Sequence, residues 1–383
     1  MHYLVKIENP DNFIMPAYLY LIIAFATAAI FSAVAMPWLL RICHRLRLYD
    51  LPNERKVHKS GIPRLGGIVF VPAVLVGMIG ALALMSRFES SIPETIRLST
   101  LLIGGGAVLV YFIGVIDDIA GSNARVKFLM QFCAAITFPA CHLFIDSLYG
   151  FCGIYTLPLW VAYPLTVFVT LLIINAINLI DGIDGLAGCL SLIGLGTYCA
   201  LFYGLNLITF VLFTASLGGA VCVFLCYNIW GRAERHTKTF MGDSGSLLLG
   251  VSLAYLTMKY AMADSKTLPE RPDGLLIAYT TLLVPCFDLC RVALCRLRRH
   301  RGIFEPDRTH IHHKLMASGL TMRQALVAIV ALQLFFMALN IGLFRLGVGM
   351  EIIVAADVVI FTVLHILLPN GQEILKNDGK HAE

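Results

Sequence analysis

The chain has 383 residues, of which 58% are hydrophobic and 14% are charged, with a mean hydropathy of +0.80 and a formal net charge of +5. Soluble proteins carry roughly 25% charged residues, so this composition excludes an ordinary soluble domain. It predicts an all-α polytopic integral membrane protein, in which the placement of the charges says more than their sum.

The hydropathy pattern predicts about eleven transmembrane helices, because one span needs about 20 apolar residues. The first apolar run is too long for a signal-peptide core and lacks a basic leading region, so we interpret it as an uncleaved span. We expect one membrane-embedded domain over residues 1–369 and a flexible cytoplasmic tail over 370–383. The predicted helices cover residues 16–40, 66–85, 99–116, 127–145, 160–177, 186–203, 206–227, 244–262, 274–295, 323–344 and 350–368.

Positive charge in the loops orients the predicted bundle. Most lysines and arginines follow the first, third, seventh and ninth predicted helices, and these loops all lie on one side of the membrane. Cytoplasmic loops carry this excess, so the N-terminus is expected outside and the C-terminus in the cytoplasm. The acidic motifs and a histidine cluster fall on the same cytoplasmic side, although they played no part in the assignment.

Two adjacent carboxylates end the third predicted helix. Asp117 and Asp118 repel each other, so one should have a raised pKa unless a cation lies nearby. Such a pair can accept a proton or bind a metal ion. Two solvated acids at a helix end are the alternative interpretation. The cationic Lys127 follows at the start of the next predicted helix.

A second acidic motif covers residues 175–185, Asn-Ala-Ile-Asn-Leu-Ile-Asp-Gly-Ile-Asp-Gly. Asn175, Asn178, Asp181 and Asp184 recur every three residues and share one face if the turn stays helical, whereas the glycines indicate a broken turn. A carboxylate left unpaired at the end of a span is costly, so these residues are candidates for a functional site. A polar contact between helices is the alternative.

Two further cytoplasmic segments suit an anion. Asp243 stands in Gly-Asp-Ser-Gly-Ser at the start of a helix, where free N–H groups favour phosphate, although a simple N-cap is the alternative. The segment 55–67 combines basic residues, among them Lys59, with glycines that let the backbone approach a ligand. For this second segment the alternative is a positive-inside loop that leads into a helix.

The loop after the ninth predicted helix is basic and rich in histidine. Histidines can bind metals or move protons, and the surrounding lysines and arginines favour an anion over a transition metal. A basic loop attracted to anionic lipid is the alternative. With the clustered acids, this loop indicates phosphoryl transfer between a nucleotide and a lipid phosphate. Its candidate residues are Arg299, Arg301, His310, His312 and His313.

Five motifs occur here in the order found in one enzyme family. The chain resembles the polyprenyl-phosphate N-acetylhexosamine-1-phosphate transferases over about residues 15–368. The motifs are Pro-Arg-Leu-Gly-Gly (63–67), Asp117-Asp118, residues 175–186, Phe-Met-Gly-Asp-Ser-Gly-Ser (240–246) and His-Ile-His-His (310–313).

The resemblance implies transfer of sugar 1-phosphate from a UDP-N-acetylhexosamine to polyprenyl (undecaprenyl) phosphate, with release of UMP. It places the reaction at the cytoplasmic face of the bacterial inner membrane, in contact with the lipid bilayer. It implies Mg²⁺, with Mn²⁺ as an alternative, and no nucleic acid. A homodimer is compatible with it.

The resemblance also implies residue roles. The metal aspartate falls on Asp243, with Asn178 as a helping amide ligand. Asp117 and Asp118 are the paired catalytic acids, one of which deprotonates the lipid phosphate or attacks as a nucleophile. The other implied roles are phosphate contact for Lys127, the uridine end for Lys59, Asp181 and Asp184, substrate binding for Asn175, Arg299 and Arg301, and catalysis for His310, His312 and His313.

Within the family, the eleventh predicted span and the sequence His-Ile-His-His favour the branch that transfers N-acetylglucosamine 1-phosphate. The phospho-MurNAc-pentapeptide translocase branch has ten spans and three consecutive histidines, and it stays open as an alternative. Residues 227–235 depart from the Asn-x-x-Pro-Ala form common in the family, which leaves the sugar open.

Outside the family, a UbiA-like membrane prenyltransferase and a transporter are the rival classes. The prenyltransferase would not need the Gly-Asp-Ser-Gly-Ser motif or the basic histidine loop. A transporter would place its ionisable groups near the bilayer midplane. Dependence on a UDP-sugar separates the transferase from both.

Overall fold

The computed structural model describes residues 16–49, 61–88, 98–262, 271–300, 302 and 309–369, with the backbone alone at 98–101. Within these ranges every named element is a helix or a 3-10 turn, and isolated bridges such as the antiparallel one between Ser147 and Thr156 form no named strand. The helices are α1 (Ala17–Leu46), α2 (Phe70–Phe88), α3 (Leu98–Ala120), α4 (Ala124–Ala140), α5 (Leu159–Ile180), α6 (Leu186–Gly204), α7 (Ile208–Ile229), α8 (Gly242–Ala261), α9 (Gly274–Thr281), α10 (Leu283–Arg298), α11 (Ile311–Ala317), α12 (Met322–Arg345) and α13 (Met350–Leu367), with short 3-10 turns η1 (Gly66–Val69), η2 (Phe151–Gly153) and η3 (Ala233–Arg235).

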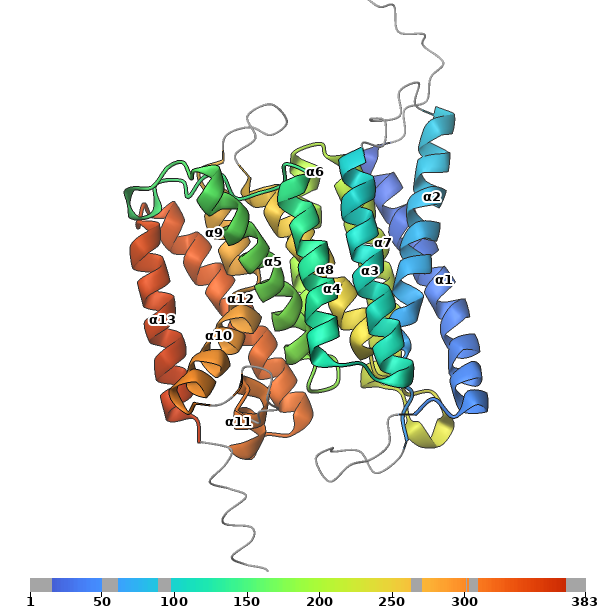
Figure 1. Cartoon of the computed structure of the whole chain (residues 1–383). Coiled ribbons are helices and arrows are strands. Elements are labelled where there is room, and N and C mark those ends of the chain that lie inside the picture. The colour runs from blue at the N-terminus through green and yellow to red at the C-terminus, as the bar shows by residue number, and fades with distance from the viewer. Residues whose placement is uncertain are drawn as a thin grey trace, which may run out of the picture.

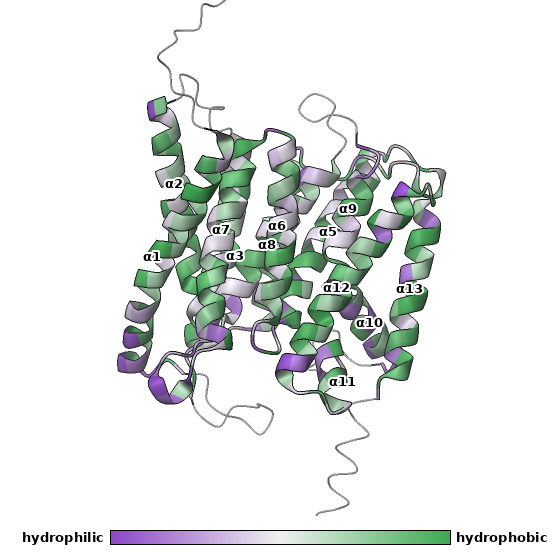
Figure 2. Ribbon diagram, turned by 180° about the vertical axis from the view of Figure 1, so that it is seen from behind, coloured by the Kyte–Doolittle hydropathy of each residue, from purple (hydrophilic) through white to green (hydrophobic). Residues whose placement is uncertain are grey.

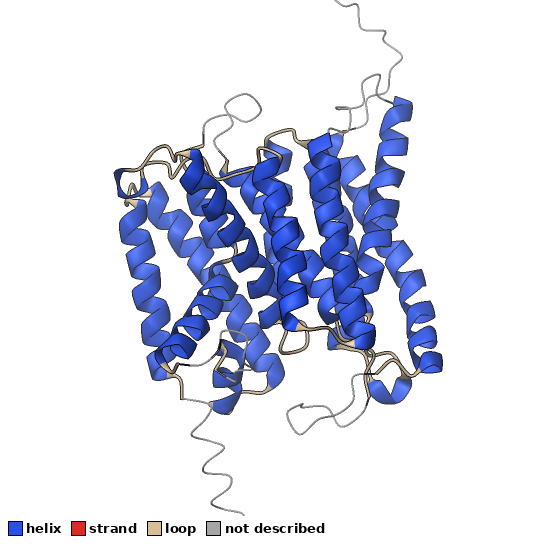
Figure 3. Cartoon of the chain, viewed as in Figure 1, coloured by secondary structure: helices blue, strands red, loops and turns tan. Residues whose placement is uncertain are grey.

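The long helices stand side by side in one bundle, with α1 and α2 at one end of the row and α13 at the other (Figure 1). Loops join them at the two edges of the bundle (Figure 3). Apolar residues cover the middle of the bundle and hydrophilic residues gather towards its edges (Figure 2). Helix α1 begins at the edge opposite the one where α13 ends. The protein is therefore a polytopic, all-helical membrane protein.

Each of the eleven predicted runs coincides with a helical segment, but a count of eleven spans is not confirmed. By length and composition, eight of the described helices can cross a membrane, or nine if the bent pair α9–α10 is one span. Helix α4 has only 17 residues and ends at Ala140, earlier than predicted. Helix α8 is rich in glycine and serine, which a helix enclosed by other helices tolerates.

The predicted run over residues 274–295 is not one continuous helix. Helices α9 and α10 meet at an angle of 68°. Proline 285 lacks an N–H group and lies in the first turn of α10, which disfavours a continuous helix. The side chain of Gln333 on α12 satisfies the freed backbone groups: it donates to the carbonyls of Thr280 and Thr281 and accepts from the N–H of Val284. This break directs α10 towards the edge of the bundle (Figure 1).

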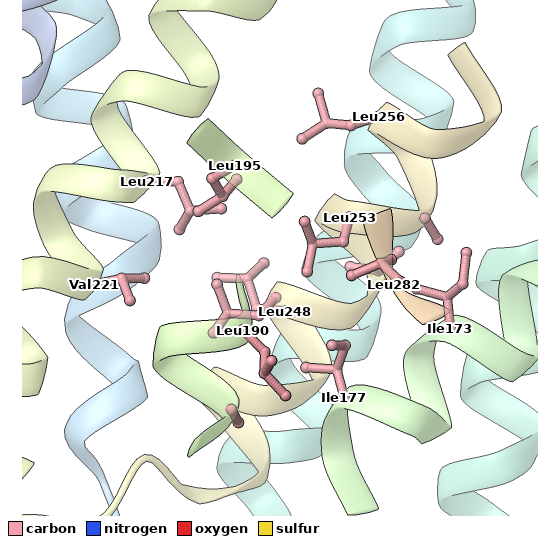
Figure 4. Close-up of a cluster of buried hydrophobic side chains, with 14 of the residues drawn as sticks. Ile173, Ile177, Leu190, Leu195, Leu217, Val221, Leu248, Leu253, Leu256 and Leu282 are labelled. Atoms are coloured by element: carbon pink, nitrogen blue, oxygen red, sulfur yellow. The ribbon is translucent and has the colours of Figure 1, made fainter. Parts of the chain in front are cut away.

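Helix α8 is the centre of the bundle. Every residue from Ser244 to Ala254 is buried, and α8 packs against α3, α5 and α6. Leucines on α8 meet apolar side chains of α5, α6 and α7 in one cluster (Figure 4). Small residues let its first turn approach its neighbours: a Cβ at Gly114 would overlap the backbone of Ser244, and one at Gly67 would overlap that of Gly245. The end of α3 is thereby held against the start of α8.

Candidate active site

The carboxylate of Asp118 caps the start of α8. Its Oδ1 accepts the backbone N–H of Asp243 at 2.8 Å, and its Oδ2 accepts that of Ser244 at 2.9 Å. A carboxylate at this place satisfies free helix N–H groups and complements the helix dipole. Gly242 has a φ of +75°, and a Cβ there would overlap Arg64 and Asp118. The glycine of the motif is therefore required for the cap.

Asp117 and Asp243 share one cation. The ammonium group of Lys127 lies 3.2 Å from Oδ2 of Asp117 and 2.8 Å from Oδ2 of Asp243. The other oxygen of Asp117 accepts the backbone N–H and the hydroxyl of Ser122, both at 2.7 Å. Carboxylate oxygens of Asp117, Asp118 and Asp243 lie within 4.8 Å of one another. We call these three residues the acid cluster.

Helix α5 brings the second acidic motif to the acid cluster. The amide of Asn178 donates to Oδ1 of Asp243 at 3.2 Å and to the hydroxyl of Ser246 at 2.8 Å. One turn earlier, the amide of Asn175 donates to Gln131 on α4 and to a carbonyl of its own helix, each at 2.8 Å. Asn178 therefore contacts the acid cluster, whereas Asn175 makes the polar contact between helices that was the alternative interpretation of this motif.

The helix breaks after Ile180, as the glycines of the motif indicate. In the loop that follows, Asp184 forms an ion pair with Lys238 at 2.5 Å. The side chain of Asn228 joins this loop to the segment before α8, because it accepts the N–H of Gly185 at 2.6 Å and donates to the carbonyl of Thr239 at 2.9 Å. Two acidic motifs that lie far apart in sequence are thereby fixed to each other.

Asp181 in the same loop has a strongly perturbed ionisation. Burial, followed by the negative charges of Asp243 and Asp184, raises the pKa of Asp181 to about 7. A carboxyl group with this pKa exchanges its proton near neutral pH, so its charge depends on the cations and substrates beside it.

The histidine cluster packs against the same loop. A Cβ at Gly182 would overlap Nε2 of His312, so this glycine makes room for the imidazole. The ring of His312 is 5.9 Å from that of His310 at an interplanar angle of 9°, and 4.2 Å from that of His313. Both nitrogens of His312 are buried without a hydrogen-bond partner among the described residues. Burial and the neighbouring histidines lower the pKa of His312 to about 3, which keeps it neutral.

The structure therefore joins most of the predicted residues into one site at one edge of the bundle. Contacts run from the acid cluster through Asn178 and the Asp181–Gly185 loop to His312. Arg299 lies exposed at the end of α10, and Lys59 and Arg301 lie outside the described residues. Sequence reasoning missed Lys238, Asn228 and a buried aspartate on α10, because no spacing links them to the motifs they support.

The donor set of the acid cluster suits a hard divalent cation. Mg²⁺ prefers carboxylate and amide oxygens and is usually held by one or two carboxylates. Asp117 and Asp243 offer such oxygens from half-buried side chains, and the amide oxygen of Asn178 is a further possible ligand, because the Asn178 side chain contacts Asp243. The cation of Lys127 between the two aspartates indicates that this place favours positive charge.

Comparisons with known proteins identify the family of this chain. A family model described as glycosyl transferase family 4 matches residues 100–261, which include the acid cluster and the 175–185 motif. A probable undecaprenyl-phosphate N-acetylglucosaminyl 1-phosphate transferase of Bacillus subtilis (strain 168) is 33% identical over 354 residues, 89% of this chain and 90% of the relative.

Two further relatives extend the likeness. An undecaprenyl-phosphate alpha-N-acetylglucosaminyl 1-phosphate transferase of Yersinia pestis is 30% identical over 76% of this chain and 75% of its own length. A decaprenyl-phosphate N-acetylglucosaminephosphotransferase of Mycobacterium leprae (strain TN) is 31% identical over 84% of this chain and 85% of its own length. The chain is a membrane enzyme that belongs to glycosyl transferase family 4.

Proposed function

We propose that the enzyme transfers N-acetylglucosamine 1-phosphate from UDP-N-acetylglucosamine to undecaprenyl phosphate at the cytoplasmic face of the bacterial inner membrane. The products are undecaprenyl-diphospho-N-acetylglucosamine and UMP, and the lipid product would start a cell-envelope polysaccharide. The names of the three relatives support the transfer of N-acetylglucosamine phosphate to a polyprenyl phosphate.

The observation that carries the proposal is the acid cluster with its shared lysine. Three carboxylates within 4.8 Å of one another repel strongly unless cations lie between them. Lys127 supplies one cation, and the cluster lies at the edge of a membrane bundle, where a lipid phosphate and a soluble nucleotide can meet. Phosphoryl transfer needs this combination, since the protein mainly positions the reactants and neutralises their charge.

In the proposed reaction, an oxygen of the lipid phosphate attacks the sugar-bound phosphorus of the UDP-sugar. A new P–O bond forms as the bond from that phosphorus to the bridging oxygen breaks, and the electron pair leaves with UMP. Asp117 is our candidate for the base that takes a proton from the lipid phosphate, because its Oδ2 contacts the side chain of Lys127, which can move, whereas both oxygens of Asp118 accept backbone N–H groups at the fixed start of α8.

The other residues bind and orient. Lys127 contacts the phosphates, and Asp243 with Asn178 would hold Mg²⁺, which supplies charge neutralisation to the diphosphate when bound. Mn²⁺ has the same ligand preference. Asp181 and Asp184 would bind the uridine, with Asp184 held in place by Lys238. The histidines and Arg299 would bind the sugar and diphosphate. The resemblance to the family adds Lys59 to the first group and Arg301 to the second.

Release of UMP from purified protein tests the proposal. The detergent-solubilised enzyme is given undecaprenyl phosphate, Mg²⁺ and UDP-N-acetylglucosamine, and parallel reactions receive UDP-N-acetylgalactosamine or UDP-MurNAc-pentapeptide. We expect UMP release that needs the lipid and UDP-N-acetylglucosamine, stops on chelation and is lost in Asp243→Asn.

Asp357→Asn is the matched control, because Asp357 is a buried aspartate on α13 that contacts Tyr279 and Asn340 and no residue of the site. It should retain activity. Folded protein that releases no UMP from any of the three UDP-sugars contradicts the proposed reaction, and activity with UDP-MurNAc-pentapeptide alone moves the enzyme to the translocase branch.

A further inference from the structure

A buried carboxylate outside the acid cluster organises the histidine loop. Asp288 lies in the middle of α10 and its residue is only 1% exposed. Its Oδ2 lies 2.7 Å from Nδ1 of His310, and its Oδ1 accepts the backbone N–H of Ile311 at 3.1 Å. One carboxylate therefore holds two consecutive residues at the start of the His-Ile-His-His motif.

Two cationic side chains, Arg291 and Lys314, also fix α11 and the residues before it. Arg291 donates to Oδ1 of Asp288 at 2.9 Å and also to the carbonyl of Thr309. Lys314 on α11 is buried and donates to the carbonyl of His365 on α13 at 2.9 Å, while Nε2 of His365 lies 4.0 Å from Asp288. The short helix α11 is thus held by α10 at its start and by the last helix further along.

The contact with Asp288 determines how His310 presents its second nitrogen. A carboxylate at hydrogen-bond distance from Nδ1 favours a proton on that nitrogen, which leaves Nε2 as the acceptor of the neutral ring. The ring of His310 is nearly parallel to that of His312, which rests against Gly182 of the acidic loop. Asp288 therefore orients His310 on the side of the site that we assign to the sugar and diphosphate.

We propose that Asp288 is a positioning residue of the transferase site, which acts through His310 by fixing its tautomer and its orientation. The inference rests on the proposed function, since it assigns His310 to that site. The charged and titratable groups on the elements around His310 are Asp288 and Arg291 on α10, His312, His313 and Lys314 on α11, and His365 on α13. The competing account is that Asp288 only ties α10, α11 and α13 together.

A double-mutant cycle separates the two accounts. Asp288→Asn keeps the size of the side chain but removes the charge that selects the tautomer. We expect kcat for UMP release to fall about 10–100-fold, the usual cost of removing a partner that orients a functional histidine, with little change in KM. His310→Ala and the double variant should lose the same activity as each other, because Asp288 acts only through His310.

Losses that multiply in the double variant overturn the inference, since a tie between helices acts independently of the His310 ring. Unchanged kcat in Asp288→Asn overturns it as well. Melting temperatures of all variants are measured alongside. If Asp288→Asn does not fold, Asp288→Ser, whose side chain is smaller than that of aspartate, replaces it in the double-mutant cycle.

Asp357→Asn makes the same chemical change at a second buried aspartate of the bundle and should keep wild-type kcat. If the wild type, this control and Asp288→Asn all release UMP with the same kcat, the positioning role fails and the proposed function stands. If the wild type releases no UMP, the proposed function fails, and the two failures are thereby distinguished.

Discussion

Lys127 and Asp243 form an ion pair of 2.8 Å between the start of α4 and the start of α8, although 116 positions separate them in the chain. The same ammonium group also lies 3.2 Å from Asp117. Lys127 therefore joins Asp117 to Asp243 and offsets the repulsion between the carboxylates that α3 and α8 hold close together. Loss of this cation should make the acid cluster depend on a metal ion.

Replacement of Lys127 by glutamine tests this dependence. We expect Lys127→Gln to lower kcat about 100-fold, the usual cost of removing one charge-stabilising donor. Relative to the wild type, the melting temperature of Lys127→Gln should be lowest in EDTA. It should also rise more on addition of Mg²⁺, because no lysine then offsets the repulsion between the carboxylates. Arg125→Gln is the control, since Arg125 is exposed near the start of the same helix. Equal Mg²⁺ responses in the wild type and Lys127→Gln would contradict the shared-cation interpretation.

Gly182 should be intolerant of any side chain. A Cβ there would overlap His312, so Gly182→Ala should displace the imidazole or the acidic loop. Misplacement of about 1 Å costs roughly 100-fold in rate, which sets the expected loss of kcat. Gly196→Ala provides the comparison, because a Cβ at Gly196 meets no neighbour. His312→Ala in the Gly182→Ala background should recover the melting temperature; no recovery would place the conflict elsewhere.

Asn228 should matter more for stability than its sequence context indicates. Its side chain bridges Gly185 and Thr239, and it is 4% exposed. Asn228→Ala leaves a buried donor and a buried acceptor unpaired, which costs about 1–3 kcal/mol for each such group. Thermal melts should show a large fall, and kcat should fall too, because the two acidic motifs lose their link. Asn123→Ala, at an exposed N-cap, should cost only about 1 kcal/mol. Similar melts for both variants would refute the bridging role.

Much of this site was predictable from the sequence, because loop charges and helix ends are local features. Continuous apolar sequence located each helical run, and the positive loops predicted that Asp117, Asp181 and Asp243 lie on one side. The resemblance implied that Asn178 assists Asp243 as a metal ligand, and the structure shows the two side chains in contact. Sequence spacing could not show which distant residues meet in the folded chain, such as Lys238 and Asp184. The break between α9 and α10 was also missed, because Gln333 on a distant helix satisfies it.

The raised pKa of Asp181 predicts how the metal-free enzyme responds to pH. Its pKa is about 7, above the value near 4 of an unfolded aspartate, so the folded state favours the protonated form. The stability that this group contributes is complete below about pH 4 and is lost as the pH rises through 7. In EDTA, the melting temperature of the wild type should fall more between pH 5 and pH 8 than that of Asp181→Asn. Parallel curves for the two proteins would show that Asp181 ionises normally.

The orientation of the bundle can be tested with two cysteines at opposite edges. Cys152 is exposed in η2. The nearby Tyr149 donates to the carbonyl of Ala261, so η2 lies near the end of α8, whereas the acid cluster lies at the start of α8. A 20-residue helix is about 30 Å long, so the two edges face opposite sides of a bilayer. In intact spheroplasts, a membrane-impermeant maleimide should label Cys152 and spare Arg125→Cys, and both should react after permeabilisation. Labelling of Arg125→Cys alone before permeabilisation would invert the topology and put the acid cluster outside, where no cytoplasmic UDP-sugar could reach it.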